Sequence, residues 1–586
     1  MMSFKRVACT CALLSLSSVW QQNMLAQTAE DAGTALLSRL TPVTDAMLRN
    51  PPAEDWLIWR RTNDTYGFSP LNQINRDNVA KLTQAWRLPL EAGSSTPTPL
   101  VHDGVLFLLS VNDTLLAMDA SNGKELWTYK HKSEGSTASS KIGIALYQDL
   151  VLMPTNDLHI VALNSRTGEV VWDHAIADVS NGRRPHSLRS APMIANGKLI
   201  QGVTATMVPE GGFIVALDLE TGEESWRFYT VARPDGPGGN TWNGIPLSAR
   251  SGGSVWMPGS YDPELDLVYF GTAPTYDTAP LLLPVNEPGV NNDALYTNVT
   301  LALRPATGEL VWHYQHIAND QWDLDWVYER QLINVPVNGV MRKAVITAGK
   351  MALFDALDAA SGEYLFSLDM GLQNLIKEID PVTGRKIMNP NATPNAEDMN
   401  LVCPFAAGGR NWQSSSYNPT SKILFLPIIE MCMNGGPTGV GSILSTGAPM
   451  EPTPLPGSDG KFGRLQAVSF ETRELLWDFR EMAPPTTAIV ATAGGLIFGG
   501  ALDNTFKAID DTTGKVLWQT DTGDVPASFP ITYAADGKQY VAVVVGQPTI
   551  HAGVFKGAMF ELTGGAEGPI GRLQSSGAAL IVYALE

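Results

Sequence analysis

The chain has 586 residues, of which 44% are hydrophobic and 17% charged, and its formal net charge is −19. This is the composition of a globular protein, and the 54 Gly and 39 Pro favour many short strands and turns over long helices. The negative charge argues against nucleic acid and anionic membranes as partners, because both require a basic face.

Residues 1–26 have the pattern of a cleavable secretory signal peptide. Lys5 and Arg6 precede a mostly apolar run that ends near Val19, and Ala26 offers a small residue before the cut. A membrane anchor is the alternative, but the run is too short to span a bilayer, and no later stretch approaches about 18 uninterrupted apolar residues. We therefore expect an exported chain, residues 27–586, without membrane insertion.

One motif recurs along this mature chain, Ala-x-Asp-x-x-Thr-Gly-x-x-x-Trp with variations. In each full copy a short apolar strand ends at Asp, a Thr-Gly or Asn-Gly turn reverses the chain, and a second strand follows. The shortest spacings between copies are about 41 to 45 residues, which is room for four short strands. There are eight copies, counting a partial first and imperfect sixth and seventh copies, and they end at Trp86, Trp127, Trp172, Trp226, Trp312, Phe366, Trp477 and Trp518.

The repeats predict an all-β fold, namely a single eight-bladed β-propeller with tryptophan-docking-type repeats over residues 27–586. The repeated Trp are expected to pack between blades rather than to bind a ligand. A multi-domain β-sandwich is the alternative, but it does not explain one motif recurring from end to end. We expect residues 56–90 to close the ring against C-terminal strands near residues 540–545.

Three stretches are longer than the repeat requires, near residues 272–295, 370–400 and 433–462. They are rich in Pro, Asn, Gly, Ser or Thr. Long insertions in a compact fold are more often lids or binding loops than accidents. We therefore expect these insertions to lie over a binding site.

Two carboxylates, Asp323 and Asp325, stand between Trp322 and Trp326. In an extended segment alternate residues share a face, so the two carboxylates are expected on the same side. Neighbouring carboxylates repel each other unless they share a cation or a proton, which suggests a hard metal ion. An exposed acidic loop is the alternative, although flanking tryptophans make a solvated loop less natural.

Two cysteines remain after the signal peptide, because Cys9 and Cys11 leave with it. In an oxidising compartment the pair Cys403 and Cys432 is most simply a disulfide. No Cys-x-x-Cys-His motif occurs, so no covalently attached haem is expected.

Four longer segments of the chain are DWLIWRRTNDTYGFSPLNQINRDNVAKLTQAW, SYDPELDLVYFGT, CPFAAGGRNWQSSSYNP and ATAGGLIFGGALDNTFKAID. Together they resemble the pyrroloquinoline quinone (PQQ)-dependent alcohol dehydrogenases, the methanol and ethanol dehydrogenase family. The resemblance covers essentially all of the mature chain. It implies a periplasmic enzyme that binds PQQ and oxidises an alcohol to an aldehyde or ketone.

The same resemblance assigns roles to individual residues. Asp323 falls on the catalytic carboxylate, a general base, and Asp325 falls where lanthanide-using members have a second aspartate. Trp256 falls on the tryptophan that stacks under PQQ, and Lys350 on the cation at the quinone oxygens. The other cofactor-lining positions are Asn411, Trp412 and Thr204, and the metal ligands would be Asp323 and Asp325, with calcium or a lanthanide as the ion.

The chain also departs from the family pattern at two metal-ligand positions. Met207 stands at the position of a glutamate ligand, with Glu210 nearby, and Pro274 at that of an asparagine. An arginine that pairs with a PQQ carboxylate is missing too, and Lys141 or Arg189 is the candidate to replace it. We therefore expect the metal site to be rearranged or lost.

Three functions are consistent with these observations. The first is a PQQ-dependent dehydrogenase that passes electrons to a separate soluble acceptor such as cytochrome c. The second is a non-catalytic propeller scaffold, which Met207 and Pro274 favour. The third is a metal-dependent hydrolase or lyase at Asp323 and Asp325. The exact alcohol is not specified by the sequence, and a homodimer is an open alternative to a monomer.

Overall fold

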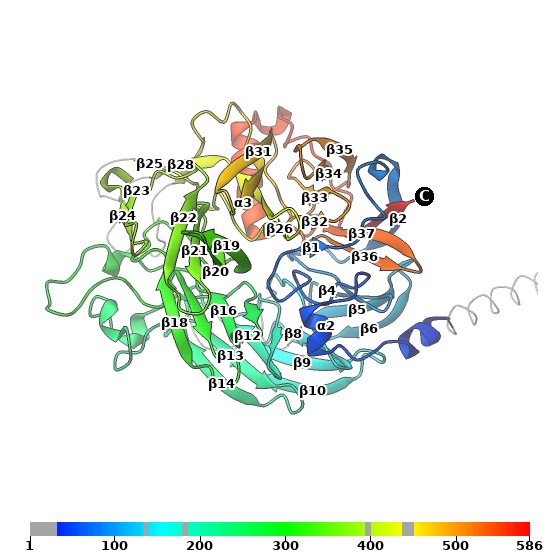
Figure 1. The fold of residues 1–586 in the computed structure, drawn as a ribbon, viewed down its shortest axis with the longest axis horizontal. Helices are drawn as coiled ribbons and strands as arrows, with labels where there is room; N and C mark the ends of the chain where they lie inside the picture. The colour runs from blue at the N-terminus through cyan, green and yellow to red at the C-terminus, as the bar shows by residue number, and fades with distance from the viewer. Residues whose placement is uncertain (1–31, 134–138, 178–185, 393–399, 436–449) are drawn as a thin grey trace, which may run out of the picture.

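The structure is a computed structural model of the protein. The residues that it describes are 32–133, 139–177, 186–392, 400–435 and 450–586. The predicted signal peptide, residues 1–26, lies outside the described residues. Antiparallel sheets follow one another around a common axis (Figure 1). Within most of them the strands are hydrogen-bonded in the order in which they occur in the chain, so each sheet is a local unit of the sequence.

The first half of the chain forms four four-stranded sheets. Their strands are β3 (Leu100–His102), β4 (Val105–Ser110), β5 (Thr114–Asp119) and β6 (Glu125–Lys130); β7 (Ala145–Tyr147), β8 (Leu150–Pro154), β9 (His159–Asn164) and β10 (Val170–Ala175); β11 (Met193–Ala195), β12 (Lys198–Gly202), β13 (Phe213–Asp218) and β14 (Glu224–Tyr229); and β15 (Ser260–Asp262), β16 (Leu267–Gly271), β17 (Val299–Leu303) and β18 (Leu310–Gln315).

The second half continues the pattern, and two of its sheets take in a strand from the N-terminal part of the chain. The strands are β19 (Gln331–Val337), β20 (Val340–Ala348), β21 (Leu353–Asp358) and β22 (Tyr364–Asp369); β26 (Ser416–Asn418), β27 (Ile423–Ile429), β30 (Gly463–Ser469) and β31 (Glu474–Glu481); β32 (Val490–Thr492), β33 (Leu496–Gly500), β34 (Thr505–Asp510) and β35 (Val516–Asp521), joined by β1 (Phe68–Ser69); and β36 (Ile531–Ala535), β37 (Lys538–Val545) and β38 (Ala579–Leu585), joined by β2 (Leu82–Pro89).

The repeated tryptophan connects one sheet to the next. The indole Nε1 of Trp172, in β10, donates a hydrogen bond to the carbonyl oxygen of Leu219, which follows β13 in the next sheet, at 3.2 Å. The ring also lies over the Thr-Gly turn that contains Gly222, whose φ is +75°. A Cβ on Gly222 would lie 2.7 Å from the ring, so the turn requires glycine for both its backbone angle and its contact. Equivalent contacts join Trp86 to Gly123, Trp127 to Gly168, Trp226 to Gly308, Trp312 to Gly362 and Trp477 to Gly514.

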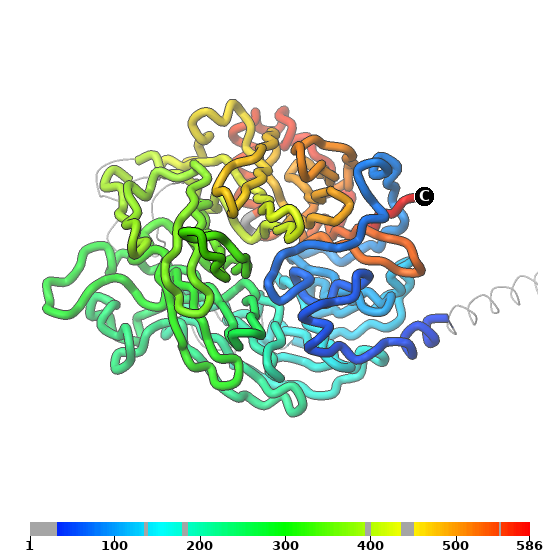
Figure 2. Tube along the Cα trace, viewed as in Figure 1, coloured from blue at the N-terminus to red at the C-terminus, as the bar shows by residue number. Residues whose placement is uncertain are grey.

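A strand from the N-terminal part of the described chain joins the sheet of the C-terminal strands. β2 pairs antiparallel with β38, and β38 pairs with β37 in the same sheet. Figure 2 shows the N-terminal segment running beside the C-terminal end. The expected partner near residues 540–545 therefore belongs to the same sheet, but β38 lies between the two. The apolar run at the very end of the chain supplies the strand that the prediction overlooked.

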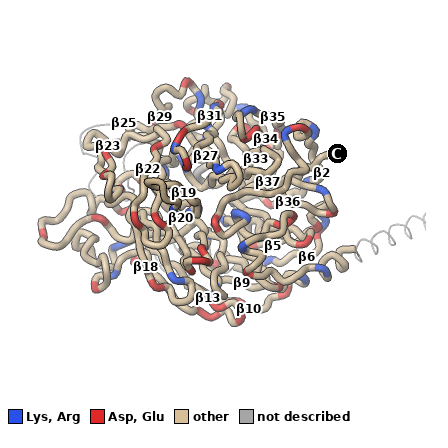
Figure 3. Tube along the Cα trace, viewed as in Figure 1, with Lys and Arg blue, Asp and Glu red and all other residues tan. Residues whose placement is uncertain are grey.

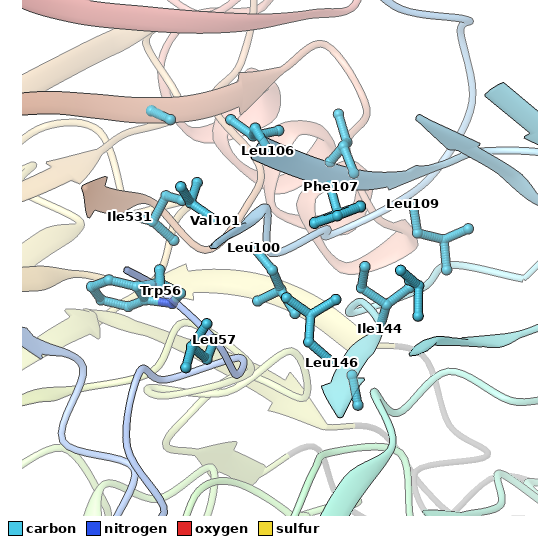
Figure 4. Close-up of a cluster of buried hydrophobic side chains, with 14 of the residues drawn as sticks. Trp56, Leu57, Leu100, Val101, Leu106, Phe107, Leu109, Ile144, Leu146 and Ile531 are labelled. Carbon is cyan, nitrogen blue, oxygen red and sulfur yellow. The ribbon is translucent and has the colours of Figure 1, made fainter. Parts of the chain in front are cut away.

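The largest buried apolar cluster lies where the N-terminal segment meets these sheets. Trp56, Leu100, Phe107 and Ile531 are each at most 1% exposed and come from the N-terminal segment, the β3–β4 hairpin and β36 (Figure 4). Burial of such side chains contributes roughly 1.5 to 3 kcal/mol each before the entropy cost of folding. The cluster therefore fixes the N-terminal segment to the ring.

Several short elements stand outside the repeated sheets. β23 (Ile376–Ile379) and β24 (Lys386–Met388) form a hairpin, and β25 (Asn400–Val402), β28 (Met431–Gly435) and β29 (Met450–Pro454) form a small sheet. A disulfide joins Cys403 and Cys432, as predicted. The helices that lie wholly within the described residues are α2 (Asp45–Arg49), α3 (Ile550–Leu562) and single 3₁₀ turns η1 (Val79–Lys81), η2 (Gly239–Thr241), η3 (Leu247–Ala249), η4 (Ala279–Leu281), η5 (Pro390–Ala392) and η6 (Gly565–Glu567). Residues 32–38 are helical as well.

The acidic residues are spread around the ring rather than gathered on one side (Figure 3). In the described part of the chain, none of the helices has the length and apolar character that a membrane crossing requires.

Candidate active site

The two predicted carboxylates lie in a tightly held turn between β18 and β19. The turn is organised by Asp320, whose carboxylate accepts hydrogen bonds from the backbone N–H groups of Trp322 (2.8 Å) and Leu324 (2.6 Å). The side-chain amide of Asn298 donates to the same carboxylate at 2.8 Å. Asp323, between these anchors, has a φ of +62°, which is uncommon for a residue other than glycine. The turn thus holds Asp323 in a conformation that its own backbone preference disfavours.

Lys350 brings the two carboxylates together. Its ammonium nitrogen lies 2.9 Å from Oδ2 of Asp323 and 3.0 Å from Oδ2 of Asp325. Its backbone N–H donates to the carbonyl oxygens of Leu324 and Asp325, both at 3.1 Å, so main chain and side chain dock on the same turn. The side chains of Lys350 and Asp325 are 1% and 3% exposed, whereas that of Asp323 is 24% exposed. Asp323 is therefore the member of the trio that a substrate can reach.

Burial and charge act in opposite directions on this trio. Burial raises the pKa of Asp323 well above its ordinary value, Lys350 opposes that rise, and Asp325 and Asp320 add to it. For Lys350, burial alone would lower the pKa, but Asp323 and Asp325 outweigh it and raise the pKa above the ordinary lysine value. The site therefore combines a permanently charged ammonium group with an Asp323 carboxylate that holds its proton more strongly than usual.

Trp256 forms a buried aromatic surface that is linked to this trio through Arg189 and Tyr328, both of which interact electrostatically with Asp325. The Arg189 guanidinium carbon lies 4.5 Å from the centre of the Trp256 ring, and Tyr328 packs edge-on against the same ring with centroids 5.4 Å apart. Burial lowers the pKa of Arg189 to about 10, and Asp325 acts against this lowering. Of the two cations considered as replacements for the missing arginine, Arg189 is thus the one stacked on Trp256.

The other candidate, Lys141, is also buried. Its ammonium nitrogen donates to the carbonyl oxygen of Leu188 at 2.9 Å, and burial lowers its pKa to about 8. The backbone N–H of Ile142, the next residue, donates to the carbonyl oxygen of Arg189 at 2.9 Å. Lys141 therefore lies on a segment that neighbours Arg189.

The remaining predicted cofactor residues lie on neighbouring segments. The carbonyl oxygen of Lys350 accepts hydrogen bonds from Gly409 and Arg410, which places Asn411 and Trp412 directly after that contact. The Asn411 amide is used within its own loop, donating to the carbonyl of Ala407 at 2.8 Å. Thr204 is paired through its backbone with Ser187, and the adjoining residue Val203 accepts a hydrogen bond from Val255. Thr204 thus lies beside the segment that contains Trp256.

At the two positions that depart from the family pattern, no side-chain oxygen replaces the expected metal ligand. Met207 and Pro274 offer no carboxylate or amide oxygen, and Glu210 does not take over. The Glu210 side chain is 55% exposed and lies 3.8 Å from Arg233, on the outside. Among the described residues, one trio of ligand-type side chains lies close enough to share a metal ion, Asp55, His102 and Asp103. Both ring nitrogens of His102 are already bonded, to Asp55 and to the carbonyl of Thr41, so this trio has a structural role.

Comparison with known proteins identifies the family. A sequence profile described as the PQQ glucose/ethanol/alcohol dehydrogenase β-propeller domain matches residues 56–370 and 442–541. This chain belongs to the PQQ-dependent alcohol dehydrogenases. It is 31% identical to quinohemoprotein alcohol dehydrogenase ADH IIB of Pseudomonas putida, over 94% of this chain and 81% of that protein. It is 30% identical to quinoprotein alcohol dehydrogenase PedH of the same species, over 82% and 84%.

Solved structures of PQQ-dependent alcohol dehydrogenases agree with this assignment. A europium-containing methanol dehydrogenase superposes with a TM-score of 0.80 at 26% identity, covering 92% of this chain and 99% of that one. ADHIIG from Pseudomonas putida gives a TM-score of 0.79 at 27% identity, covering 93% and 82%. The predicted family, the class of enzyme and the all-β propeller fold are thereby confirmed.

Three residues of the site were not predicted from the sequence. Asp320 is the third carboxylate of the Asp-x-x-Asp-x-Asp run, and that spacing was the available signal. Tyr328 is fully buried beside Trp256, and burial raises its pKa far above the usual value, with Asp325 adding to the rise. Burial likewise raises the pKa of Tyr276, two residues after Pro274, and Asp325 and Asp323 add to the rise. Nothing in the local sequence of either tyrosine points to the site.

Proposed function

We propose that this PQQ-dependent alcohol dehydrogenase uses Asp323 as the base that removes the hydroxyl proton of an alcohol, which becomes an aldehyde or ketone. The observation that carries this proposal is the position of Lys350 between Asp323 and Asp325, next to Trp256 under Arg189. A non-catalytic scaffold has no need for a buried ammonium group that holds two carboxylates, because burying such charges is costly.

The residues around Trp256 fit PQQ, a flat tricarboxylate. Trp256 offers an aromatic face, and Lys350, Arg189 and Lys141 offer positive charge. Several buried polar atoms have no hydrogen-bond partner within the described residues, namely Nε and Nη2 of Arg189, Oγ1 of Thr204 and the hydroxyl of Tyr328. A buried polar group without a partner costs about 1 to 3 kcal/mol, and a polar ligand at this position would remove that cost. We infer that Trp256, Arg189, Lys350 and Thr204 hold the cofactor, and that Trp412 and Asn411 support it from the adjoining segment.

The carboxylates offer a metal ion a reduced set of ligands. Oδ1 of Asp323 and Oδ1 of Asp325 are buried and lack a hydrogen-bond partner within the described residues, while both Oδ2 atoms face Lys350. Hard oxygen atoms suit calcium or a lanthanide, but such ions take six or more ligands. We infer that Asp323 and Asp325 would hold the ion, and that other groups must complete its shell in place of Met207 and Pro274.

When bound, PQQ supplies the two-electron acceptor and the metal ion supplies a Lewis acid. The protein residues position the substrate proton. Asp323 is partly exposed and receives that proton at its carboxylate, and its raised pKa makes it a stronger base than an ordinary aspartate. Lys350 contacts Oδ2 of Asp323 and leaves Oδ1 without a hydrogen-bond partner within the described residues.

Three further features belong to this proposal. We infer that each four- or five-stranded sheet is one blade, which gives an eight-bladed propeller with the loops near 272–295, 370–400 and 433–462 as insertions.

The disulfide supports an oxidising compartment such as the periplasm. The two electrons taken from the alcohol then pass to a separate soluble electron acceptor, which we propose is a cytochrome c.

The test combines cofactor binding with activity. Purified protein is titrated with PQQ, alone and with Ca²⁺ or La³⁺, by tryptophan fluorescence, and is then assayed for dye-linked oxidation of primary, secondary and polyol alcohols. Asp323→Asn should still bind PQQ but lose at least about 100-fold in kcat. Asp235→Asn, at an exposed position, is the matched control and should keep wild-type activity. Absence of both PQQ binding and oxidation in the wild-type protein would support the scaffold alternative, which Met207 and Pro274 favour.

A further inference from the structure

A cavity lies at the edge of the sheet β11–β14, and its lining residues differ from those proposed to hold the cofactor. Its volume is about 520 Å³, within the range of ligand pockets. One wall is formed by Phe213, the first residue of β13, and Tyr229, the last of β14, which face each other in the strand register. The β12–β13 connection, including Val208 and Pro209, forms an apolar wall.

Two arginines are stacked on this aromatic wall. The guanidinium carbon of Arg227 lies 4.1 Å from the centre of the Phe213 ring, and that of Arg233 lies 3.9 Å from the centre of the Tyr229 ring. The two rings are 6.3 Å apart. Stacking of this kind holds a guanidinium plane in place and leaves its edge available for hydrogen bonds.

The two arginines differ in how much of their charge is balanced. Arg227 donates from Nε and Nη2 to the carboxylate of Glu224, at 3.1 and 2.6 Å, and is thereby neutralised. Arg233 donates from Nη1 to a backbone carbonyl, that of Glu210, at 3.0 Å. The nearest carboxylate oxygen of Glu210 lies 3.8 Å away on a largely exposed side chain. Glu210 also lines the cavity, so its carboxylate balances part of the Arg233 charge. Within the described residues, Nε and Nη2 of Arg233 have no hydrogen-bond partner, so this edge of the guanidinium is available to a ligand.

His186 completes the cavity as a neutral group. Its Nε2 lies 3.2 Å from the carbonyl oxygen of Gly211 and therefore acts as the donor, while its ring packs edge-on against Phe213. Burial lowers the pKa of His186 below its ordinary value. The cavity thus presents the Nε–Nη2 edge of Arg233 beside an aromatic and apolar surface, with Glu210 as the nearest carboxylate.

We propose that this cavity binds an aromatic carboxylate. The carboxylate pairs with the free edge of Arg233, and the ring of the ligand packs against the apolar wall and the stacked guanidinium of Arg227. Carboxylate binding by a guanidinium edge is charge-assisted and directional, and the apolar wall selects acids that have a ring. The site does not depend on PQQ binding, because none of its residues belongs to the proposed cofactor site.

The test uses benzoate as the probe on PQQ-loaded protein, so that the proposed cofactor site is filled. Binding is measured by isothermal titration calorimetry and by ligand-observed saturation-transfer NMR. Arg233→Gln should weaken benzoate binding about tenfold or more. The matched control is Arg473→Gln, because Arg473 is also stacked on an aromatic ring, 4.1 Å from the centre of Phe366, but lies outside the cavity. This control should bind benzoate as the wild-type protein does.

A second measurement requires no variant. Benzamide has the ring but not the charge, and acetate has the charge but not the ring, so both should bind at least about tenfold more weakly than benzoate. The proposal is overturned if benzoate does not bind the wild-type protein, or if benzamide binds as tightly. It is also overturned if Arg189→Gln, rather than Arg233→Gln, abolishes binding, since benzoate would then occupy the cofactor site. If the protein does not bind PQQ, the proposed function fails. The same binding measurements with benzoate, benzamide and acetate on the PQQ-free protein still test the present proposal.

Discussion

Lys350 places one ammonium group between two carboxylates, and this arrangement decides the protonation state of the proposed base. The pair of short ion contacts leaves Asp325 buried and Asp323 partly exposed. In a buried setting the charged form of a carboxylate depends on its cationic partner, because water no longer stabilises it. Lys350 therefore favours the charged form of Asp323 and opposes the burial that raises its pKa.

This dependence predicts a specific pH profile. The alcohol proton can be accepted only by deprotonated Asp323, so kcat/KM should fall as the pH falls through the pKa of Asp323. Because that pKa is raised, the acidic limb should lie above the ordinary aspartate value of about 4. In Lys350→Gln the carboxylate loses its cation, its pKa rises further, and the limb should move to higher pH. The profile of kcat/KM against pH for PQQ-loaded enzyme is the measurement.

The matched control for this profile is Lys343→Gln. Lys343 also bridges two carboxylates, Asp262 at 2.8 Å and Glu264 at 2.7 Å, but it lies in the first half of β20, whereas Lys350 follows the end of that strand. The control should leave the acidic limb unchanged. A limb that stays in place or moves to lower pH in Lys350→Gln would show that Asp323 is not the base.

At the scale of elements, the fold depends on the contact between a tryptophan and the glycine turn of the next sheet. The same indole hydrogen bond recurs around the ring, for example from Trp127 to Ser165 at 3.0 Å and from Trp226 to Pro305 at 2.8 Å. Each contact joins residues about 40 to 80 positions apart, so it converts a local repeat into an interface between sheets.

Gly222→Ala tests this contact. The new methyl group would meet the Trp172 ring, and alanine would be strained at a φ of +75°. We expect a destabilisation of about 2 to 4 kcal/mol, from strain of about 1 kcal/mol and overpacking of about 1 to 3 kcal/mol. Gly197→Ala is the control, because Gly197 has a φ of +71° with no atom within 4 Å of the new methyl group. The thermal midpoint should fall clearly more in Gly222→Ala than in Gly197→Ala, and equal changes would reject the contact as the cause.

At the scale of the whole molecule, the N-terminal strap, residues 41–56, ties several sheets together. Its backbone pairs with Gln148, with Val101 and, through Glu54, with Ala534. Under the strap His102 bonds Asp55 at 2.8 Å and the carbonyl oxygen of Thr41 at 2.7 Å. The strap therefore joins the start of the described chain to its last sheet through the backbone of Glu54, and His102 holds both ends of the strap, at Thr41 and Asp55.

The stability supplied by His102 should depend on pH. Burial alone would lower its pKa, but Asp55, Thr41 and Asp103 raise it above the ordinary value of 6.5. A histidine whose pKa is raised on folding stabilises the protein fully below its unfolded pKa and loses this effect as the pH rises through its folded pKa. His102→Gln should therefore lower the thermal midpoint by more at pH 5.5 than at pH 9.

Asp55→Asn provides the control for this prediction. Without the Asp55 carboxylate, His102 keeps only Asp103 as a charged partner, so the effect of His102→Gln in the Asp55→Asn background should differ less between the two pH values. A pH-independent loss in the wild-type background would instead mean that His102 acts through packing alone.

The sequence by itself determined the repeated sheets, the family, the disulfide pair and the position of the two carboxylates. These features rest on residues that are close together in the chain, or, for the cysteines, on elimination. A strand, its turn and the next strand are specified by hydrophobic alternation and by glycine, which act over a few residues. The pair Asp323 and Asp325 was found for the same reason.

Only the tertiary structure decided how these parts combine. Lys350 reaches the carboxylates, Arg189 stacks on Trp256, Glu210 points outward, and β38 separates β2 from β37. The helix α3 and the cavity around Arg233 were not predicted either. Each of these features joins residues distant in sequence or depends on burial, and neither distance in space nor loss of water is encoded in a local pattern. Charge and reactivity at the site therefore follow from the folded ring and not from the motif alone.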